Sequence, residues 1–337
     1  MLLISFTAFE LYSEEKEKAS GSSAGEFIKV GGTGAQFLKI APGARATGMA
    51  GAYGAVANDL SSIYWNPAGI AEIRGITGSF SYTSWFAGFN HNFAAVAIPV
   101  GSNFTAAAGF TSFASDKIER TTIERPEGTG IYYEVSDVAA SVSFCGYLTD
   151  QFSFGITGKY VSNAFASVAA SGIAFDVGTM YETGIQGIKL GFSIHNLGTT
   201  MTYSGQDLIT SKKLYEAMYA SKVDASYNAS PYGMPLTFRA GLSSNLYKSE
   251  EHSVLAALDF VTMSDTPEQF ALGAEYTWRN FVMVRAGYKL EHDQFGLGAG
   301  LGLKYTTGGF QGQIDYSANP TLDLGWIHRL SVSVGMK

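Results

Sequence analysis

The stretch that decides the fold reads QFGLGAGLGLKY and runs from Gln294 to Tyr305. Every second residue from Phe295 onward is apolar, and the intervening positions hold glycines and Lys304. Because successive side chains of a β-strand point to opposite faces, this segment has one continuous apolar face and one face of glycine and charge. The glycines lie within a strand and not in a phosphate-binding loop, so they indicate an inner face crowded against other parts of the chain.

The same two-residue alternation recurs from Thr77 to the C-terminus. Most segments are about ten residues long, which is the length of a tilted strand that crosses a bilayer. The alternation predicts an all-β fold: a transmembrane antiparallel β-barrel of about 14 strands, with a small N-terminal plug or hatch that contains short helices. The predicted strands are 77–86, 91–100, 103–114, 136–147, 151–163, 172–183, 187–196, 234–246, 252–262, 268–278, 279–290, 294–307, 310–318 and 326–337.

The composition agrees with a membrane β-protein better than with a soluble enzyme. Charged residues make up 15% of the 337 residues and aromatic residues 14%, whereas about a quarter of an ordinary soluble chain is charged. The net charge of −7 provides no basic surface for nucleic acid. A single cysteine, Cys145, excludes an internal disulfide and a cysteine-clustered zinc site. No apolar run reaches the roughly 18 residues of a transmembrane helix.

The lengths of the connections support closure into a barrel. Numbered in order, the even gaps between the predicted strands are short, among them 101–102, 148–150 and 308–309. The longest gaps, 115–135 and 197–233, are odd and therefore lie together on the opposite side. Bacterial barrels combine short periplasmic turns with long extracellular loops, so we expect the long gaps outside the cell and tight turns on the other side. Within the second long gap, residues 212–222 predict a short helix at the extracellular mouth.

The strand faces opposite the apolar ones carry charged residues in a consistent phase. Facing lipid, each charge would cost roughly 2–4 kcal/mol at the bilayer midplane, so we expect them to point into the lumen and pair across it. The alternative is the solvated face of a soluble sheet. The predicted lumen-facing charges are Lys159, Asp176, Lys189, Arg239, Asp259, Glu275, Arg285, Lys304, Asp315 and Arg329.

The N-terminal part of the chain lacks alternation and divides into three segments. Residues 1–13 are largely apolar and predict the remnant of a signal peptide, although no basic residues precede them. Residues 14–26 are polar and predict a flexible segment. Residues 27–76 are rich in small side chains, so they predict a compact hatch folded into the lumen of a barrel that residues 77–337 form.

The sequence contains no convincing catalytic or metal-binding group. The five histidines are scattered without the spacing of metal ligands. An enzyme of the outer membrane would need a Ser/His/Asp group at the rim, and the sequence indicates none. We therefore expect a protein that is not an enzyme and has no cofactor. The histidines are His91, His195, His252, His292 and His328.

Two stretches resemble a known family. Residues 34–53, GAQFLKIAPGARATGMAGAY, are similar to the N-terminal signature of the PorV/PorQ family. Residues 57–71, ANDLSSIYWNPAGIA, resemble that family's D…YWNPAG element, whose Asn-Pro-Ala turn is shared with the FadL family of channels. Over the rest of the chain the resemblance is architectural. It implies a FadL-like barrel of the bacterial outer membrane with an N-terminal hatch.

The resemblance also implies site residues. Carried onto this chain, the second element assigns hatch and gating roles to Asn58, Asp59, Tyr64, Trp65, Asn66, Pro67, Ala68 and Gly69. Asn-Pro is a strong turn former in any protein, so a purely structural turn is the alternative for residues 66–68.

Two functions follow from the resemblance. The first is a PorV/PorQ-type barrel that handles secreted protein cargo or docks a secretion system, as PorV-like members do at the type IX secretion outlet. It predicts a filled lumen and an extracellular rim that binds a protein. The alternative is a FadL-like channel for fatty acids or other small hydrophobic molecules. It predicts an apolar pocket above the hatch and a lateral opening or kink in the wall. The expected partners are outer-membrane lipid with either secretion subunits and cargo or a hydrophobic ligand, and no nucleic acid.

Overall fold

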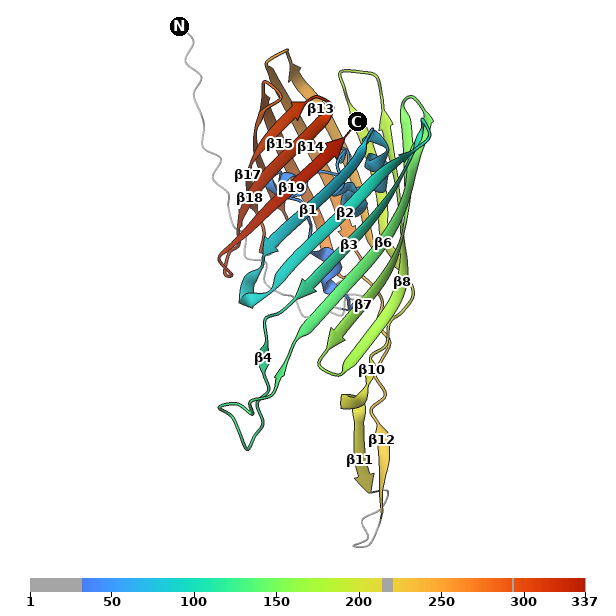
Figure 1. Cartoon of the computed structure of the whole chain (residues 1–337), viewed down its shortest axis with the longest axis vertical. Coiled ribbons are helices and arrows are strands. Elements are labelled where there is room, and N and C mark those ends of the chain that lie inside the picture. The colour runs from blue at the N-terminus through green and yellow to red at the C-terminus, as the bar shows by residue number, and fades with distance from the viewer. Residues whose placement is uncertain (1–31, 214–220, 293, 337) are drawn as a thin grey trace, which may run out of the picture.

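The computed structural model describes residues 32–213, 221–292 and 294–336. The predicted signal-peptide remnant 1–13, the polar segment 14–26 and the start of the predicted hatch lie outside these ranges. The described chain forms one antiparallel barrel, and residues 33–75, called the N-terminal segment below, lie inside it (Figure 1). None of the described helices is long and apolar enough to cross a membrane.

Fourteen strands surround the lumen, and pairing of the first with the last closes the barrel. This confirms the predicted fold class. The strands are β1 (Ile76–Ser84), β2 (Asn90–Val100), β3 (Phe104–Ala114), β6 (Val135–Thr149), β7 (Phe152–Phe165), β8 (Val168–Glu182), β9 (Lys189–Gly198), β13 (Thr237–Lys248), β14 (His252–Met263), β15 (Thr266–Trp278), β16 (Val282–Leu290), β17 (Leu297–Thr307), β18 (Phe310–Pro320) and β19 (Trp326–Met336).

The two faces of the wall differ as the alternation predicts. In β17, Leu297, Leu301 and Tyr305 are exposed on the outside, whereas Gly298 and Gly300 are buried inside. Other strands repeat this arrangement with exposed Phe, Ile, Leu and Val. Lipid, and not water, is the solvent in which such an apolar outer surface is stable.

Polar groups on the outside gather near the strand ends. At the end where β1 finishes, the Tyr82 hydroxyl donates to Asn90 Oδ1 over 2.6 Å. At the opposite end, the Tyr276 hydroxyl lies 2.7 Å from His252 Nδ1. Aromatic rings with a polar tip are typical of the two bilayer interfaces, so these pairs indicate where the apolar band ends.

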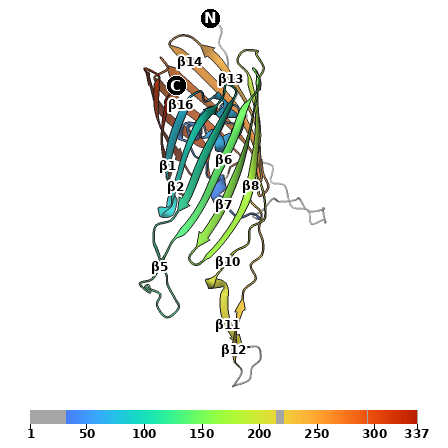
Figure 2. The same ribbon diagram turned by 45° about the vertical axis from the view of Figure 1, so that its right-hand side comes forward.

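Two arms extend from the same end of the barrel (Figures 1 and 2). One lies between β3 and β6 and contains β4 (Ile118–Glu119) and β5 (Tyr132–Tyr133). The other lies between β9 and β13 and contains β10 (Ser204–Gly205), η4 (Gln206–Leu208), β11 (Ile209–Lys213) and β12 (Lys222–Ser226). Since bacterial barrels carry their long loops outside the cell, we assign this end as extracellular.

Two expectations about the extracellular end were wrong. The helix predicted for 212–222 is absent from its described parts, because β11 and β12 pair from Ile209–Ser226 to Lys213–Lys222; residues 214–220 lie outside the described ranges. Tight turns also occur at this end. β7 and β8 remain paired up to Phe165 and Val168, well beyond the predicted strand ends at 163 and 172. Small and apolar residues there continue the strand, so the gap of 164–171 becomes a hairpin.

The N-terminal segment runs through the lumen from one end to the other. It starts at the extracellular end, where Thr33 bridges Gly233, and reaches the periplasmic end, where β1 begins at Ile76. Its short helices are η1 (Gln36–Lys39), α1 (Ala44–Gly48), α2 (Ser62–Trp65) and η2 (Pro67–Glu72). One further turn of 3-10 helix, η3 (Phe86–Gly88), lies outside this segment between β1 and β2.

Inward-facing glycines let the N-terminal segment approach the wall. A Cβ at Gly287 would lie 2.3 Å from the backbone carbon of Met49, and one at Gly155 would lie 2.3 Å from that of Pro67. Backbone therefore packs on backbone, which confirms the crowded inner face predicted from the glycine pattern. The inner-wall glycines in close approach to the segment are Gly155, Gly178, Gly191, Gly241, Gly273, Gly287 and Gly298.

Candidate functional site

Asn66 fixes the N-terminal segment to the wall. Its side-chain amide donates to the carbonyl of Gly54 over 2.8 Å and to that of Thr179 in β8 over 3.1 Å. Its Oδ1 accepts from the N–H of Ala68 over 3.2 Å and so caps η2, in which Pro67 takes the first position. Asn66 therefore joins two parts of the segment to one strand of the barrel, and its side chain is fully buried.

The residues that follow Asn66 have no space for larger side chains. Ala68 is fully buried, and a Cβ on Gly69 would lie 2.0 Å from the carbonyl oxygen of Ala57. Pro67 packs on the glycines of β7 and β8 described above. The small and rigid residues of this turn are thus explained by contact with the wall. This packing supports the structural alternative for residues 66–68.

Tyr64 and Trp65, the last two residues of α2, bind earlier parts of the N-terminal segment. The Trp65 indole donates to the carbonyl of Pro42 over 3.1 Å, and the Arg239 guanidinium lies 4.6 Å from its ring centroid. The Tyr64 hydroxyl donates to the carbonyl of Lys39 over 3.0 Å. Both rings therefore tie α2 to the start of the segment.

Most of the predicted lumen-facing charges form networks inside the barrel. The largest network joins the N-terminal segment to three strands. Arg45 donates to both carboxylate oxygens of Glu275 over 2.9 Å. Arg285 then donates to Glu275 over 2.5 Å and to Asp315 over 2.7 Å. Since buried charges are stable only when paired, this chain of ions holds α1 against β15, β16 and β18.

A second network lies on β7, β8 and β9. Lys159 lies 2.8 Å from Asp176 Oδ1, and His195 Nδ1 lies 3.4 Å from Asp176 Oδ2. The pairing of β8 with β9 shifts register here, and Asn196 adopts a positive φ of 62° and donates its N–H to Asp176. The result is a β-bulge that turns both His195 and Asn196 toward the interior.

Ser193, His195 and Asp176 are arranged like the triad of a hydrolase. His195 Nε2 lies 2.8 Å from Ser193 Oγ, and its Nδ1 faces Asp176. Sequence reasoning missed this group, since Asp176 and His195 lie on different strands. Ser193 is buried, however, and its hydroxyl donates to the carbonyl of Trp65 over 3.3 Å. The aspartate is already neutralised by Lys159. The group therefore packs the N-terminal segment and has no access for a substrate carbonyl.

The remaining predicted charges also face the interior. Arg239 pairs with Asp259 at 3.3 Å, and Asp259 accepts the backbone N–H groups of Tyr53 and Gly54. Lys189 lies 2.7 Å from Glu72 of η2. Lys304 lines the polar cavity described next, and Arg329 is buried between β18 and β1.

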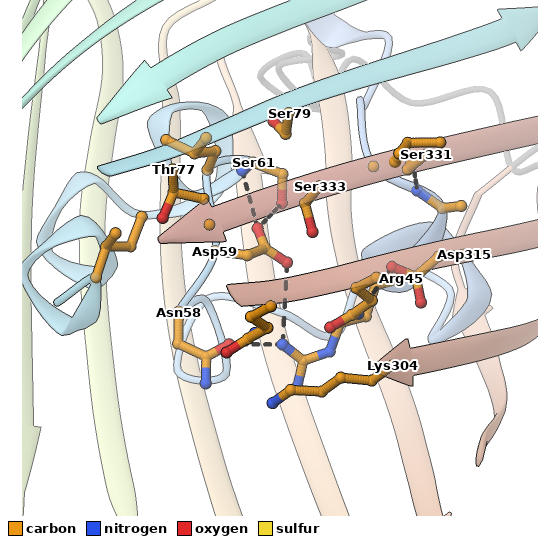
Figure 3. Close-up of a pocket in the computed structure, with 18 of the residues that line it drawn as sticks. Arg45, Asn58, Asp59, Ser61, Thr77, Ser79, Lys304, Asp315, Ser331 and Ser333 are labelled. Carbon is orange, nitrogen blue, oxygen red and sulfur yellow. Dashed lines mark hydrogen bonds and ion pairs between the residues drawn. The ribbon is translucent and has the colours of Figure 1, made fainter. Parts of the chain in front are cut away.

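A polar cavity of about 590 Å³ lies at the periplasmic end, between the N-terminal segment and the wall (Figure 3). Asn58 and Asp59 contribute to it from the segment. Asp59 accepts the Tyr53 hydroxyl over 2.6 Å and the Ser61 hydroxyl over 2.5 Å. Across the cavity the wall is rich in hydroxyls and amides from Thr77, Ser79, Gln311, Gln313, Ser331 and Ser333. Such a lining suits water and polar solutes.

A smaller cavity of about 50 Å³ lies at the extracellular half of the lumen. Phe37, Leu38, Ile40 and Ile63 form its apolar side, with Phe93, Ala139 and Met263 from the wall. Its polar side comes from Lys39, Ser141, Lys159, His195, Asn196, Thr237 and Arg239. The bulge of β9 borders this cavity, and the pairing of β8 with β9 shifts register beside it.

The cover of this apolar cavity is held by one carboxylate. Asp265, in the turn between β14 and β15, accepts hydrogen bonds from Thr33, Gln36 and Lys39 over 2.5, 2.9 and 3.0 Å. Burial alone would raise the pKa of Asp265, but these donors outweigh it and lower that pKa below its usual value. The charged form therefore fastens η1 over the cavity.

Comparison with known proteins shows which solved structures have a similar fold. No protein-family model and no curated protein matches the chain. Among solved structures, the toluene transporter TodX of Pseudomonas putida has a TM-score of 0.54 at 10% identity, over 83% of this chain and 94% of that one. A TodX mutant described as a monoaromatic hydrocarbon channel has a TM-score of 0.54 at 11% identity, over 84% and 98%. The toluene transporter TbuX of Ralstonia pickettii has a TM-score of 0.50 at 12% identity, over 82% and 92%.

At these identities the likeness concerns the fold. The similar structures are channels and transporters and not enzymes. No comparison supports the PorV/PorQ interpretation, which remains a prediction from residues 34–71. With its apolar outer face and its closed antiparallel wall, the protein has the fold of the fourteen-stranded FadL-like barrels and resides in the bacterial outer membrane.

Proposed function

We propose that this barrel is a channel for small hydrophobic molecules that enter from outside the cell. The observation that carries the proposal is the apolar cavity between η1, α2 and the wall at the extracellular half of the lumen. The toluene transporters that share the fold support the same class of cargo. Ligand sites of this kind are concave, mostly apolar and equipped with a few polar groups.

The lining favours a molecule with an apolar body and one polar or acidic end. Phe37, Leu38 and Ile63 would contact the body. On the opposite side stand Lys159 and Arg239, each paired with an aspartate, and the side chains of His195 and Asn196. A fatty acid satisfies both sides, whereas a plain hydrocarbon satisfies the apolar side alone.

The cavity is too small for a ligand in this structure. Its volume of about 50 Å³ is well below the roughly 150 Å³ of an engineered apolar cavity that binds benzene. A ligand must therefore displace part of the cover, and η1 is the element that the Asp265 hydrogen bonds hold in place. Binding and opening are thus coupled in this proposal.

The experiment is uptake of labelled toluene and labelled decanoate by cells that carry wild-type protein or one of two variants. Ala139 points into the cavity, and its neighbour Ala140 points outward from the same strand. Ala139→Phe fills the cavity and should reduce uptake to the level of cells without the protein. Ala140→Phe adds the same ring on the lipid side and should leave uptake unchanged.

The proposal fails if Ala139→Phe folds, as judged by heat-modifiable mobility, and still takes up both compounds at the wild-type rate. Preference for decanoate over toluene would support the role given to Lys159 and Arg239. The reverse preference would restrict the cargo to hydrocarbons.

One observation favours the secretion function as a second candidate. The β4–β5 and β11–β12 arms expose apolar side chains far from the wall, including Ile123 at 99%, Tyr132 at 56% and Tyr227 at 67% exposure. Exposed apolar side chains on projecting arms are suited to a protein partner. Loss of secreted proteins from the medium of cells that lack the barrel, with hydrophobic uptake unaffected, would favour this candidate over the channel.

A further inference from the structure

Three inward side chains form a row across the seam where the barrel closes. Thr83 of β1 is paired directly with Arg329 of β19 on one side and with His91 of β2 on the other. Side chains opposite each other on one face of antiparallel strands have Cβ atoms about 5 Å apart. The Cβ atoms of the three residues therefore lie side by side.

All three residues are buried, and four of their polar atoms have no partner among the described residues. Arg329, Thr83 and His91 are 4%, 0% and 1% exposed. Within the described residues, Arg329 Nε, Thr83 Oγ1 and both ring nitrogens of His91 make no hydrogen bond. Unpaired buried polar atoms are rare because each has lost its water without a replacement. Their concentration at one place indicates an occupant.

The charge of this row is uncompensated. No Asp or Glu of the described chain forms an ion pair with Arg329, whose Nη1 donates to the neutral Asn319 Oδ1 over 2.8 Å and whose guanidinium lies 5.8 Å from the Trp85 ring centroid. The charge of Arg329 also acts on Lys289, as does that of Arg239, which itself is paired with Asp259. The positive charge of Arg329 therefore has no carboxylate paired with it among the described residues.

The available groups converge on one kind of ligand. A guanidinium N–H, a hydroxyl and an imidazole N–H can all donate to a single acceptor. Because the buried charge of Arg329 is uncompensated, that acceptor should be negatively charged. Each unpartnered atom is buried from solvent, so the site has no opening for the tail of an organic acid.

We propose that Arg329, Thr83 and His91 form an internal site for one monatomic anion of the size of chloride. The anion neutralises Arg329 and links the first two strands of the barrel to the last. This site is separate from the apolar cavity, whose lining includes none of the three residues, so it does not depend on the proposed transport function.

The direct test is diffraction from crystals soaked in sodium bromide. An anomalous peak within hydrogen-bonding distance of Arg329 Nε and Thr83 Oγ1 is expected. Ordinary water density without an anomalous signal, or no density at all, would overturn the proposal.

A second test measures thermal unfolding of the purified barrel in sodium chloride and in sodium gluconate of equal ionic strength. Chloride should raise the Tm of the wild type by roughly 2–4 °C when it exceeds its Kd tenfold. Thr83→Val keeps the shape but removes the donor and should abolish the difference. Thr83→Ser keeps the donor and should retain it.

Arg329→Gln should also abolish the chloride effect, whereas Arg279→Gln, in the exposed turn between β15 and β16, should not. If Arg329→Gln fails to fold, the Thr83 pair still decides the matter. An equal chloride effect in Thr83→Val and Thr83→Ser, or no effect in the wild type, would show that no anion occupies this row.

Discussion

At the scale of single residues, Asn66 shows how a short turn can anchor a whole segment. One amide satisfies carbonyls of Gly54 and Thr179, which are distant in sequence, while its oxygen caps η2. Aspartate could cap η2 but has no N–H to donate. Asn66 Oδ1 also lies so close to Gly178 that a Cβ added there would be 2.1 Å away, which leaves no room for the longer side chain of glutamine. The asparagine of the NPAG turn thus has a physical reason, apart from any gating role.

We predict that Asn66→Ala loosens the N-terminal segment while the barrel still forms. The change removes both hydrogen bonds that the amide donates, and a buried group left without a partner costs about 1–3 kcal/mol. Limited proteolysis should cleave within residues 42–66 faster than in the wild type. Asn58→Ala is the control, since Asn58 is exposed and its Oδ1 accepts from Arg45. Equal resistance of the two variants would contradict the anchoring role.

At the scale of elements, η1 and the wall are joined by chemistry that depends on pH. Three donors from residues 33–39 meet on one oxygen of Asp265. The pKa of Asp265 is lowered in the folded protein, so its contribution to stability is present above the unfolded value near 3.8 and is lost as the pH falls through the lowered value. Protonation removes the ion pair with Lys39 and weakens the other hydrogen bonds.

Release of η1 should therefore increase below about pH 4, in the direction given by this shift. Hydrogen–deuterium exchange of the amides of residues 38–40, corrected for intrinsic rates, measures it. Asp265→Asn should show fast exchange at neutral pH and little further change on acidification. Asp224→Asn, on the exposed β12, is the matched control and should behave like the wild type. Wild-type protection in Asp265→Asn would show that η1 is held by packing alone.

At the scale of the whole molecule, some features could be predicted from the sequence because their signal is local. Apolar residues alternate with glycine or lysine within the strand at 294–305 itself. In lipid, strands with such an apolar outer face must pair into a closed barrel. The inward direction of charges such as Glu275 follows from the same phase. The turn at Ala166 was missed because the strands on both sides extend beyond the apolar band, where alternation no longer separates lipid from lumen.

The arrangement inside the lumen could not be predicted, because it depends on contacts between distant parts of the chain. Nothing near Gly178 in the sequence indicates that Asn66 will lie against it. The row of Thr83 and Arg329 exists only after the first and last strands pair. The bulge at Asn196 depends on a side chain of the neighbouring strand, Asp176, which accepts its N–H. Such features require the register of the closed barrel.

The two arms allow the proposed functions to be separated on the complete protein. No residue of the β4–β5 arm, 118–133, lines the polar or the apolar cavity. A hairpin outside the bilayer also contributes nothing to the pairing of β3 with β6, which extends from Phe104–Gly146 to Ala114–Ser136. Replacing residues 119–132 by a short glycine-rich turn should therefore preserve folding, and uptake of hydrophobic compounds should continue at the wild-type rate.

Uptake of hydrophobic compounds and secretion of proteins, measured in the same cells, distinguish a channel from a docking protein. With the arm shortened and the barrel intact by heat-modifiable mobility, a channel retains uptake, because its cavity lies between η1, α2 and the wall. A docking protein loses partner binding, because Ile123 and Tyr132 are removed from the surface. Reduced uptake in an intact barrel would mean that the arm belongs to the path of the ligand, and the path would then start beyond the membrane and not at the cover of the apolar cavity.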